Sequence, residues 1–358
     1  MINGDNIMNL CVFNPEHDIA LAHGSRFFTA PRAGRQLRAD LGFLSVLWAG
    51  EDDYVLVADR EKAEQSLRQL GLCKDGVTLV DAEGLRKAAL RIDRVCPWGW
   101  DAAMKNELQR LGVALEAMPS DECLENYRQL SHRKCSQYVL RQIICNLSDD
   151  RLVGKSVLLD NELALREQLK LWPLSVLKAP WSSSGRGVRF VEGASTDAIM
   201  SWAVGVMRQQ GTLMVEPFYD KVQDFGMEFM ADGHSVSYVG LSIFGTRGSA
   251  YTGNMLASEE DKLAVLSRYI NVGLLDKVRD ALCALFSKEL FSAYVGPLGV
   301  DMMIVRSAEG VFCVHPCVEV NLRMTMGHVA VKLSSRLSSS FSSMCIEYAE
   351  GHYHLNLL

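Results

Sequence analysis

Glu319-Val320-Asn321-Leu322-Arg323 ends a long run of alternating apolar residues and carries a polar side chain at every second position. Another strand-like run, Gly299-Val300-Asp301-Met302-Met303-Ile304-Val305, precedes it, and residues 306–310 between the two resemble a turn. This spacing predicts an antiparallel hairpin. Side chains alternate between the faces of a strand, so the three polar residues of the first run share a face, and Asp301 can lie opposite them.

The polar residues of this hairpin suit a metal ion. Two carboxylates and an amide oxygen, from Asp301, Glu319 and Asn321, are hard oxygen ligands of the kind that hold Mg²⁺ together with phosphates. If these groups are buried they need partners, because an unpaired buried polar group costs free energy. The alternative is a solvated cluster of surface charges. We expect a metal site.

Upstream, a strand followed by a small-residue loop indicates phosphate binding. Residues 174–178 form an apolar run that ends in Lys178, and Ser and Gly dominate the next segment, residues 182–187. Small residues let backbone N–H groups approach phosphate oxygens, and the lysine supplies a charge. The G-K-[ST] of a Walker loop is missing. The alternative is a hairpin with a flexible tip.

A third motif has the features of a nucleoside site. Residues 213–219 form an apolar strand that ends in Glu216 and aromatic residues, and residues 224–229 begin another strand. The free backbone groups of a strand edge can bind adenine, and a nearby carboxylate can bind ribose hydroxyls. The alternative is a plain hairpin with two acids facing solvent.

Strands and helices alternate in the first third of the chain. Strands are predicted at residues 9–13, 55–58, 77–80, 92–96 and 113–118, with Asp59 and Asp101 as helix caps. This order predicts a parallel, Rossmann-like sheet, and the absence of G-x-G-x-x-G disfavours a dinucleotide site.

Ligands of such sheets bind beyond the carboxyl ends of the strands. Glu16, His17 and Asp18 follow the first strand, so they are candidates for a substrate contact. The alternative is a proline turn in which Glu16 or Asp18 caps the next helix.

Composition narrows the class of protein. The chain has 358 residues, 48% hydrophobic and 22% charged, with a net charge of −6, which argues against a general nucleic-acid binder. We expect no membrane span and no secretory signal, because no apolar run is long enough and no basic segment opens the chain. The ten cysteines form no C-x-x-C pair, so we expect reduced thiols and a cytoplasmic protein.

In this order, the motifs resemble the ATP-grasp family, which includes D-alanine–D-alanine ligase and biotin carboxylase. The resemblance covers about residues 120–335, and Leu322 stands where proline is frequent in the family. It implies a Rossmann-like domain at residues 1–118. An ATP-grasp fold of two α+β subdomains follows: residues 119–235, with a helical linker, and residues 236–358, with the metal hairpin and a C-terminal helix.

The resemblance also implies roles for individual residues. Those expected to bind ATP are Lys134, Lys178, Ser183, Ser184, Gly185, Gly187, Glu216, Phe218 and Glu228. Arg133 is the alternative to Lys134 as a second phosphate ligand. Asp220 and Asp224 are alternatives to Glu228 at the ribose, because the segment after Glu216 is longer than in several relatives.

The catalytic side of the site is implied in the same way. Asp301, Glu319 and Asn321 would hold Mg²⁺ or Mn²⁺, and Arg323 would face the transferred phosphate. Arg247 would contact substrate or phosphate, the alternative being an exposed turn residue.

The activity implied is that of an ATP-dependent carbon–nitrogen ligase, in which a small-molecule carboxylate becomes an acylphosphate that an amine attacks. A kinase on the same fold and a non-catalytic nucleotide-binding module are the alternatives. Many relatives dimerise, so a homodimer is compatible with the resemblance. No nucleic-acid or membrane partner is expected.

Overall fold

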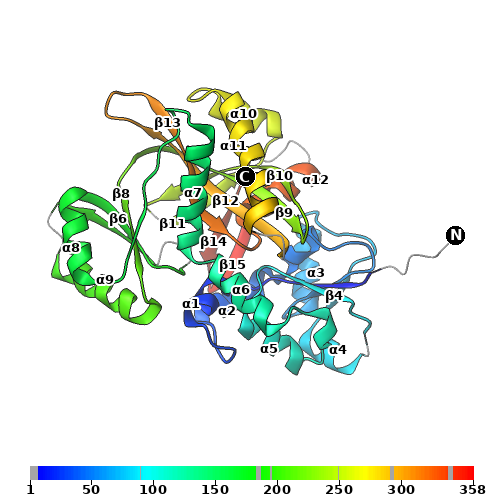
Figure 1. Ribbon diagram of the computed structural model, residues 1–358. Helices are drawn as coiled ribbons and strands as arrows, with labels where there is room; N and C mark the ends of the chain where they lie inside the picture. Colours follow the sequence, from blue (N-terminus) through cyan, green and yellow to red (C-terminus); the bar gives the residue numbers. More distant parts are fainter. Residues whose placement is uncertain are drawn as a thin grey trace. The chain divides into compact units, whose positions relative to one another are not determined.

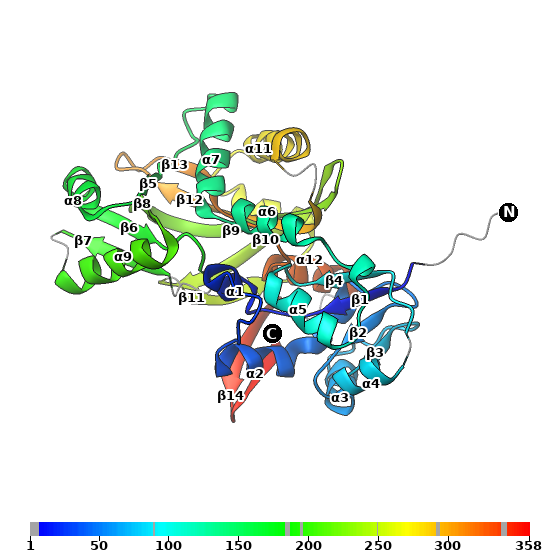
Figure 2. The same ribbon diagram turned by 60° about the horizontal axis from the view of Figure 1, so that its bottom comes forward.

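The computed structural model describes residues 7–88, 90–182, 187–193, 196–248, 250–290, 294–337 and 342–358. The chain divides into two compact units (Figure 1, Figure 2). Residues 1–129 and 335–358 form the first unit, and residues 130–334 form the second. The three predicted segments with boundaries after residues 118 and 235 stay predictions.

A four-stranded parallel sheet is the centre of the first unit. Its strands lie in the order β3-β2-β1-β4. Their bounds are β1 Asn9–Val12, β2 Tyr54–Leu56, β3 Thr78–Val80 and β4 Arg94–Pro97. The strands are short and mostly buried, as expected where helices cover a parallel sheet. The predicted Rossmann-like sheet is confirmed for these four strands.

The predicted fifth strand at residues 113–118 is wrong. A short 3-10 helix, η2 (Leu115–Ala117), lies there instead. Val113, Ala117 and Met118 are buried while Leu115 is 55% exposed. A turn satisfies that spacing, whereas a strand would alternate buried and exposed positions.

Helices connect these strands, and aspartates cap several of them. The helices of this unit are α1 His17–His23, α2 Arg32–Leu41, η1 Gly42–Leu47, α3 Arg60–Gln69, α4 Ala82–Lys87, α5 Ala102–Arg110 and, at the boundary, α6 Asp121–Leu130. Asp59 accepts the backbone N–H of Lys62 and Asp101 that of Met104, so both predicted caps are confirmed.

The end of the chain returns to the first unit as a hairpin. Strands β14 (Ser343–Ala349) and β15 (His352–Leu357) pair antiparallel, and β15 packs on α2. Asp40 of α2 accepts the backbone N–H of Tyr353 at 2.8 Å.

The second unit contains an antiparallel run of long strands in the order β13-β12-β9-β10-β11. Their bounds are β9 Asp220–Asp232, β10 Val236–Arg247, β11 Ala250–Met255, β12 Val295–Arg306 and β13 Phe312–Asn321. Around them lie α7 Arg133–Leu147, α10 Glu259–Leu266, α11 Val272–Leu285, η3 Phe286–Leu290 and α12 Met326–Arg336. Helix α7 packs on β13, and α11 packs on α7 and β10.

A smaller antiparallel sheet completes this unit. Its strands lie in the order β5-β8-β6-β7, with bounds β5 Val157–Leu159, β6 Leu174–Lys178, β7 Val188–Glu192 and β8 Leu213–Pro217. Helices α8 (Glu162–Leu171) and α9 (Asp197–Gln210) lie beside this sheet (Figure 1). Their buried apolar side chains share a core with those of the sheet. A parallel α/β sheet followed by antiparallel α+β sheets confirms the predicted fold class. None of the described helices is long and apolar enough to cross a bilayer.

Candidate functional site

The strand register gathers the predicted metal ligands on one face of the long sheet. Asp301 on β12 lies opposite Glu319 on β13 and opposite Gly226 on β9. One step along, Gly299 lies opposite both Asn321 and Glu228. The alternate residues of β12 and β9 are almost fully buried and apolar: Leu298, Val300, Met302, Phe225, Met227 and Phe229. One face of these strands therefore builds core, and the other presents polar side chains.

Asp301, Asn321 and Arg323 are joined by hydrogen bonds. The amide of Asn321 donates through Nδ2 to Asp301 Oδ2 at 3.0 Å. The Arg323 guanidinium donates to Asn321 Oδ1 at 2.8 Å and to the Met324 carbonyl at 2.9 Å. The Asp301 carboxylate and the Asn321 amide oxygen, which could face a metal, are thus already oriented by these hydrogen bonds.

Burial and neighbouring carboxylates make the charged form of Asp301 costly. Burial, followed by the charges of Glu319 and Glu228, raises the pKa of Asp301 to about 7, although Arg323 and the hydrogen bond from Asn321 lower it in part. A divalent cation between Asp301 and Glu319 would relieve that repulsion, so the residues fit a hard metal ion. Within the part of the chain that the structure describes, no cluster of three His, Cys, Asp or Glu forms a metal site. The candidate set is two carboxylates and an amide.

A buried arginine reaches Glu319 from the start of helix α7. Arg133 is 5% exposed, and its Nη2 lies 2.7 Å from Glu319 Oε1. Its Nη1 donates to Ser182 Oγ at 2.7 Å and to the carbonyl of Ala179. Lys134, the next residue, is exposed. Lys134 and Arg133 were the two candidates for the second phosphate ligand, and Arg133 is the one that contacts Glu319. The assignment of Lys134 to ATP stays a prediction.

Lys178 and Glu216 form a second ion pair on the smaller sheet. They lie on neighbouring strands, β6 and β8, with Lys178 Nζ 2.6 Å from Glu216 Oε2. Lys178 Nζ also lies 3.5 Å from the carbonyl of Val318, next to Glu319 on β13. The two predicted ATP ligands are therefore in contact with each other, and Lys178 reaches the strand that carries the predicted metal ligands.

The remaining residues predicted to bind ATP differ in how they are placed. Phe218 is 51% exposed and packs edge-to-face on Phe190. At Gly187 a Cβ would lie 2.2 Å from the Cβ of Ser182, so only glycine fits at this close approach. Ser183, Ser184 and Gly185 lie outside the described residues.

Glu228 is enclosed by protein groups. It is 2% exposed, and Ser242, Thr325 and His328 all contact its carboxylate. Burial raises its pKa, but the charge of His328 and the hydrogen bonds bring it below the usual range. Thr325 and His328 were not among the predicted site residues; the available signal was a threonine at the start of a helical pattern.

The alternatives for the ribose are more open. Asp224 lies on the same face of β9 and is 14% exposed, with Lys221 Nζ at 2.6 Å and Thr246 Oγ1 at 2.7 Å. Asp220 is exposed and lies 3.6 Å from Arg306. Arg247 ends β10 and is exposed. The roles of Glu228, Asp220, Asp224 and Arg247 stay predictions.

In the first unit, the residues that follow β1 form hydrogen bonds and ion pairs with other protein groups. His17 is buried, with Nδ1 3.2 Å from Asp101 Oδ2, and Asn14 donates to the carbonyl of Gly99 at 2.8 Å. Glu16 pairs with Arg38 at 3.1 Å. These contacts favour a structural role for this loop.

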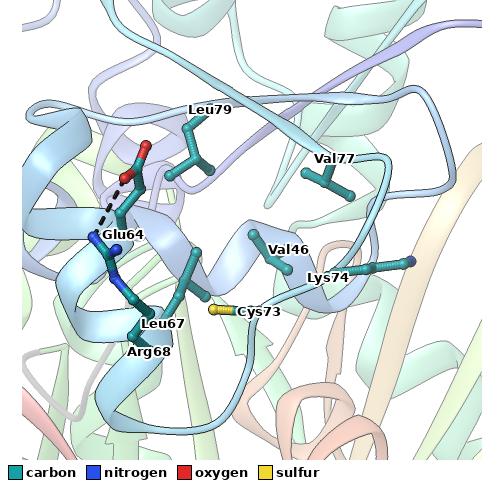
Figure 3. Close-up of a pocket in the computed structure, with 8 residues that line it drawn as sticks. All are labelled: Val46, Glu64, Leu67, Arg68, Cys73, Lys74, Val77 and Leu79. Carbon is teal, nitrogen blue, oxygen red and sulfur yellow. Dashed lines mark hydrogen bonds and ion pairs between the residues drawn. The ribbon is translucent and has the colours of Figure 1, made fainter.

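A separate pocket of about 270 Å³ lies in the first unit. Figure 3 shows Glu64 and Arg68 paired at one side of it, with Cys73 and Lys74 among the other lining residues. It contains none of the predicted site residues.

The comparisons with known proteins bear on the fold. No protein-family model matches the sequence, and no curated protein is similar to it. A solved structure of N5-carboxyaminoimidazole synthetase from Staphylococcus aureus with ADP has a TM-score of 0.50 at 8% identity, over 97% of this chain and 83% of that chain. A biotin carboxylase–βγ-ATP complex from Campylobacter jejuni also has a TM-score of 0.50, at 15% identity, over 91% and 67%.

Biotin carboxylase belongs to the family that the motifs resemble, so sequence order and fold agree. The chain has the ATP-grasp fold, which confirms the resemblance.

Proposed function

We propose that this chain is an ATP- and Mg²⁺-dependent ligase that joins a small-molecule carboxylate to an amine. One observation carries the proposal: two carboxylates and an amide share a face of the long sheet, and Arg133, Lys178 and Arg323 converge on the same strands. Anionic ligands for a metal beside cations for phosphates are what phosphoryl transfer requires. The similarity of the fold to the two nucleotide-bound structures supports this.

Several residues would bind the nucleotide. Lys178 and Arg133 would contact its phosphates, since each is a buried cation beside β13 and each can exchange a carboxylate or carbonyl partner for a phosphate oxygen. Glu216 and the exposed Phe218 would line the adenine. Among the three acids considered for the ribose, we favour Asp224, because it shares the polar face and is less buried than Glu228.

Asp301, Glu319 and Asn321 would hold Mg²⁺ or Mn²⁺. When bound, the ion neutralises charge on the phosphoryl oxygens. Arg323, already oriented by Asn321, would face the transferred phosphoryl group, and Arg247 would contact the substrate. The contribution of the protein is then positioning and electrostatic stabilisation.

The proposed reaction has two steps. An oxygen of the substrate carboxylate attacks the γ-phosphorus, the bond to the β-phosphate oxygen breaks, and ADP leaves. The amine nitrogen then attacks the acyl carbon, the carbon–oxygen bond to phosphate breaks, and inorganic phosphate leaves as the amine loses a proton. One ADP and one phosphate therefore form for each carbon–nitrogen bond.

Product analysis tests this proposal. The protein is incubated with Mg·ATP and pools of carboxylates and amines, and ADP and free phosphate are measured in parallel. A ligase releases both in equal amounts, and Glu319→Gln abolishes the release. ADP without free phosphate would identify a kinase instead. Binding of Mg·ATP with no product from any pool would identify a non-catalytic nucleotide-binding module.

A further inference from the structure

A buried polar cluster joins strand β9 to the turn that leads into helix α12. Thr325 Oγ1 donates to Glu228 Oε2 at 2.8 Å, and His328 Nδ1 lies 2.9 Å from the same oxygen. Ser242 on β10 donates to Glu228 Oε1 at 2.9 Å. The carboxylate, on the middle strand of the sheet, thus bonds to the neighbouring strand on one side and to the turn on the other.

The turn also contacts strand β9 through the other ring nitrogen of His328. His328 Nε2 lies 3.2 Å from the carbonyl of Phe229, the residue after Glu228. Within the turn, Thr325 Oγ1 also accepts the backbone N–H of His328 at 3.1 Å, which caps the helix. The side chains that cap α12 are therefore the same ones that bind the carboxylate of Glu228.

Two glycines leave space for this carboxylate. A Cβ at Gly327 would lie 1.8 Å from Glu228 Oε1, and a Cβ at Gly299 would lie 2.6 Å from Glu228 Oε2. Neither glycine has a positive φ, so conformational freedom does not explain them. A side chain at either position would therefore collide with the Glu228 carboxylate.

The same turn carries Arg323. Its guanidinium is bonded to Asn321 on one side of the turn, while Thr325 and His328 are fastened to Glu228 on the other. We propose that Glu228 is a positioning residue that fixes the turn at residues 323–328, so that Arg323 faces the transferred phosphoryl group. This inference rests on the proposed function for the identity of that group, but the fastening of the turn is independent of it.

The first experiment needs no nucleotide. Amide hydrogen exchange is measured on the whole chain for wild type, Glu228→Gln, Thr325→Val and the control Ser237→Ala, an exposed position on β10. We expect at least tenfold faster exchange of the amides of residues 323–328 in the first two variants and wild-type rates in the control, because local opening exposes those amides. Unchanged rates in both variants would overturn the proposal.

The second experiment separates positioning from general stability. Dissociation constants are measured for Mg·ADP and for Mg·AMP-PNP, which carries the third phosphate. We expect Glu228→Gln and Arg323→Ala each to lose at least tenfold in affinity for Mg·AMP-PNP while Mg·ADP changes less than twofold.

Two results of this experiment would contradict the inference. Equal losses for both ligands in Glu228→Gln would indicate a merely structural role, and no loss in Arg323→Ala would show that Arg323 does not face the third phosphate. If the wild type binds neither ligand, the proposed function fails, whereas the hydrogen exchange result still decides whether Glu228 fastens the turn.

Discussion

Arg133 and Glu319 form an ion pair of 2.7 Å although 186 residues separate them in the sequence. The pair joins the first residue of helix α7 to strand β13, and the arginine is nearly fully buried. Under the proposed function its two members bind different ligands, a phosphate and a metal ion. Binding of a phosphate to Arg133 and binding of a metal ion to Glu319 must therefore each break the ion pair. Because either event releases the other residue, each ligand should favour the binding of the other.

Metal binding in the absence of nucleotide tests this competition. We expect Arg133→Gln to bind Mn²⁺ at least fivefold more tightly than wild type, because Glu319 is released and a nearby positive charge is removed. Electron paramagnetic resonance of free Mn²⁺ measures this directly. Lys134→Gln, next to it on α7 but exposed, is the matched control and should match wild type.

The same variant should bind nucleotide more weakly, although it binds the metal ion more tightly. Arg133→Gln removes a charge-assisted contact to phosphate, so we expect at least tenfold weaker binding of Mg·ATP by calorimetry. Wild-type affinity in this variant, or an equal loss in Lys134→Gln, would show that Arg133 is not the phosphate ligand.

Lys178 should be essential for binding of Mg·ATP and should also stabilise the smaller sheet. Lys178→Met leaves Glu216 buried without its cation, so we expect the free energy of unfolding to fall by about 3 kcal/mol. Adding Glu216→Met should restore most of that stability but not the binding of Mg·ATP. Denaturant unfolding and calorimetry measure the two effects, and restored nucleotide binding in the double variant would argue against a phosphate contact.

Asp301 should make the metal-free protein less stable as pH rises. Its folded-state pKa of about 7 lies above its ordinary value of 3.8, so the folded state holds a proton that the unfolded state has lost. The resulting stability is fully present below about pH 4 and is lost as pH rises through 7, by roughly 4 kcal/mol at most. Asp301→Asn should lack this loss in unfolding measurements with a chelator present. Parallel pH curves for the two proteins would contradict the assignment.

Local patterns in the sequence were sufficient for the hairpin and for most of the parallel sheet. Alternation over residues 299–305 and 319–323 places Asp301, Glu319 and Asn321 on one face, because side-chain direction in a strand depends only on position. The four parallel strands were predictable because each is a short apolar run, and three of the runs are followed by a helix with an aspartate cap. The segment at residues 113–118 was not, since its apolar residues suit a turn as well as a strand.

Local sequence patterns could not predict contacts between segments that are distant in the chain. Arg133 and Lys134 have similar chemistry, and only the orientation of helix α7 decides which one reaches β13. The family resemblance implied a ribose contact for Glu228, but it could not show that Thr325 and His328, about a hundred residues further on, bind its carboxylate. In both cases tertiary packing, which the sequence does not display, decides the environment of the side chain.

The central claim is that the polar face of the long sheet binds Mg·ATP, and thermal unfolding tests it most directly. Wild type, Glu319→Gln and the surface control Glu162→Gln are heated with and without Mg·ATP, and again with ATP and chelator. A ligand that binds only the folded state adds about 2.7 kcal/mol at a hundredfold excess over its Kd. We predict an upward shift of Tm in wild type and in Glu162→Gln that requires Mg²⁺ and is absent in Glu319→Gln. No shift in wild type, or the same shift in Glu319→Gln, would contradict the account.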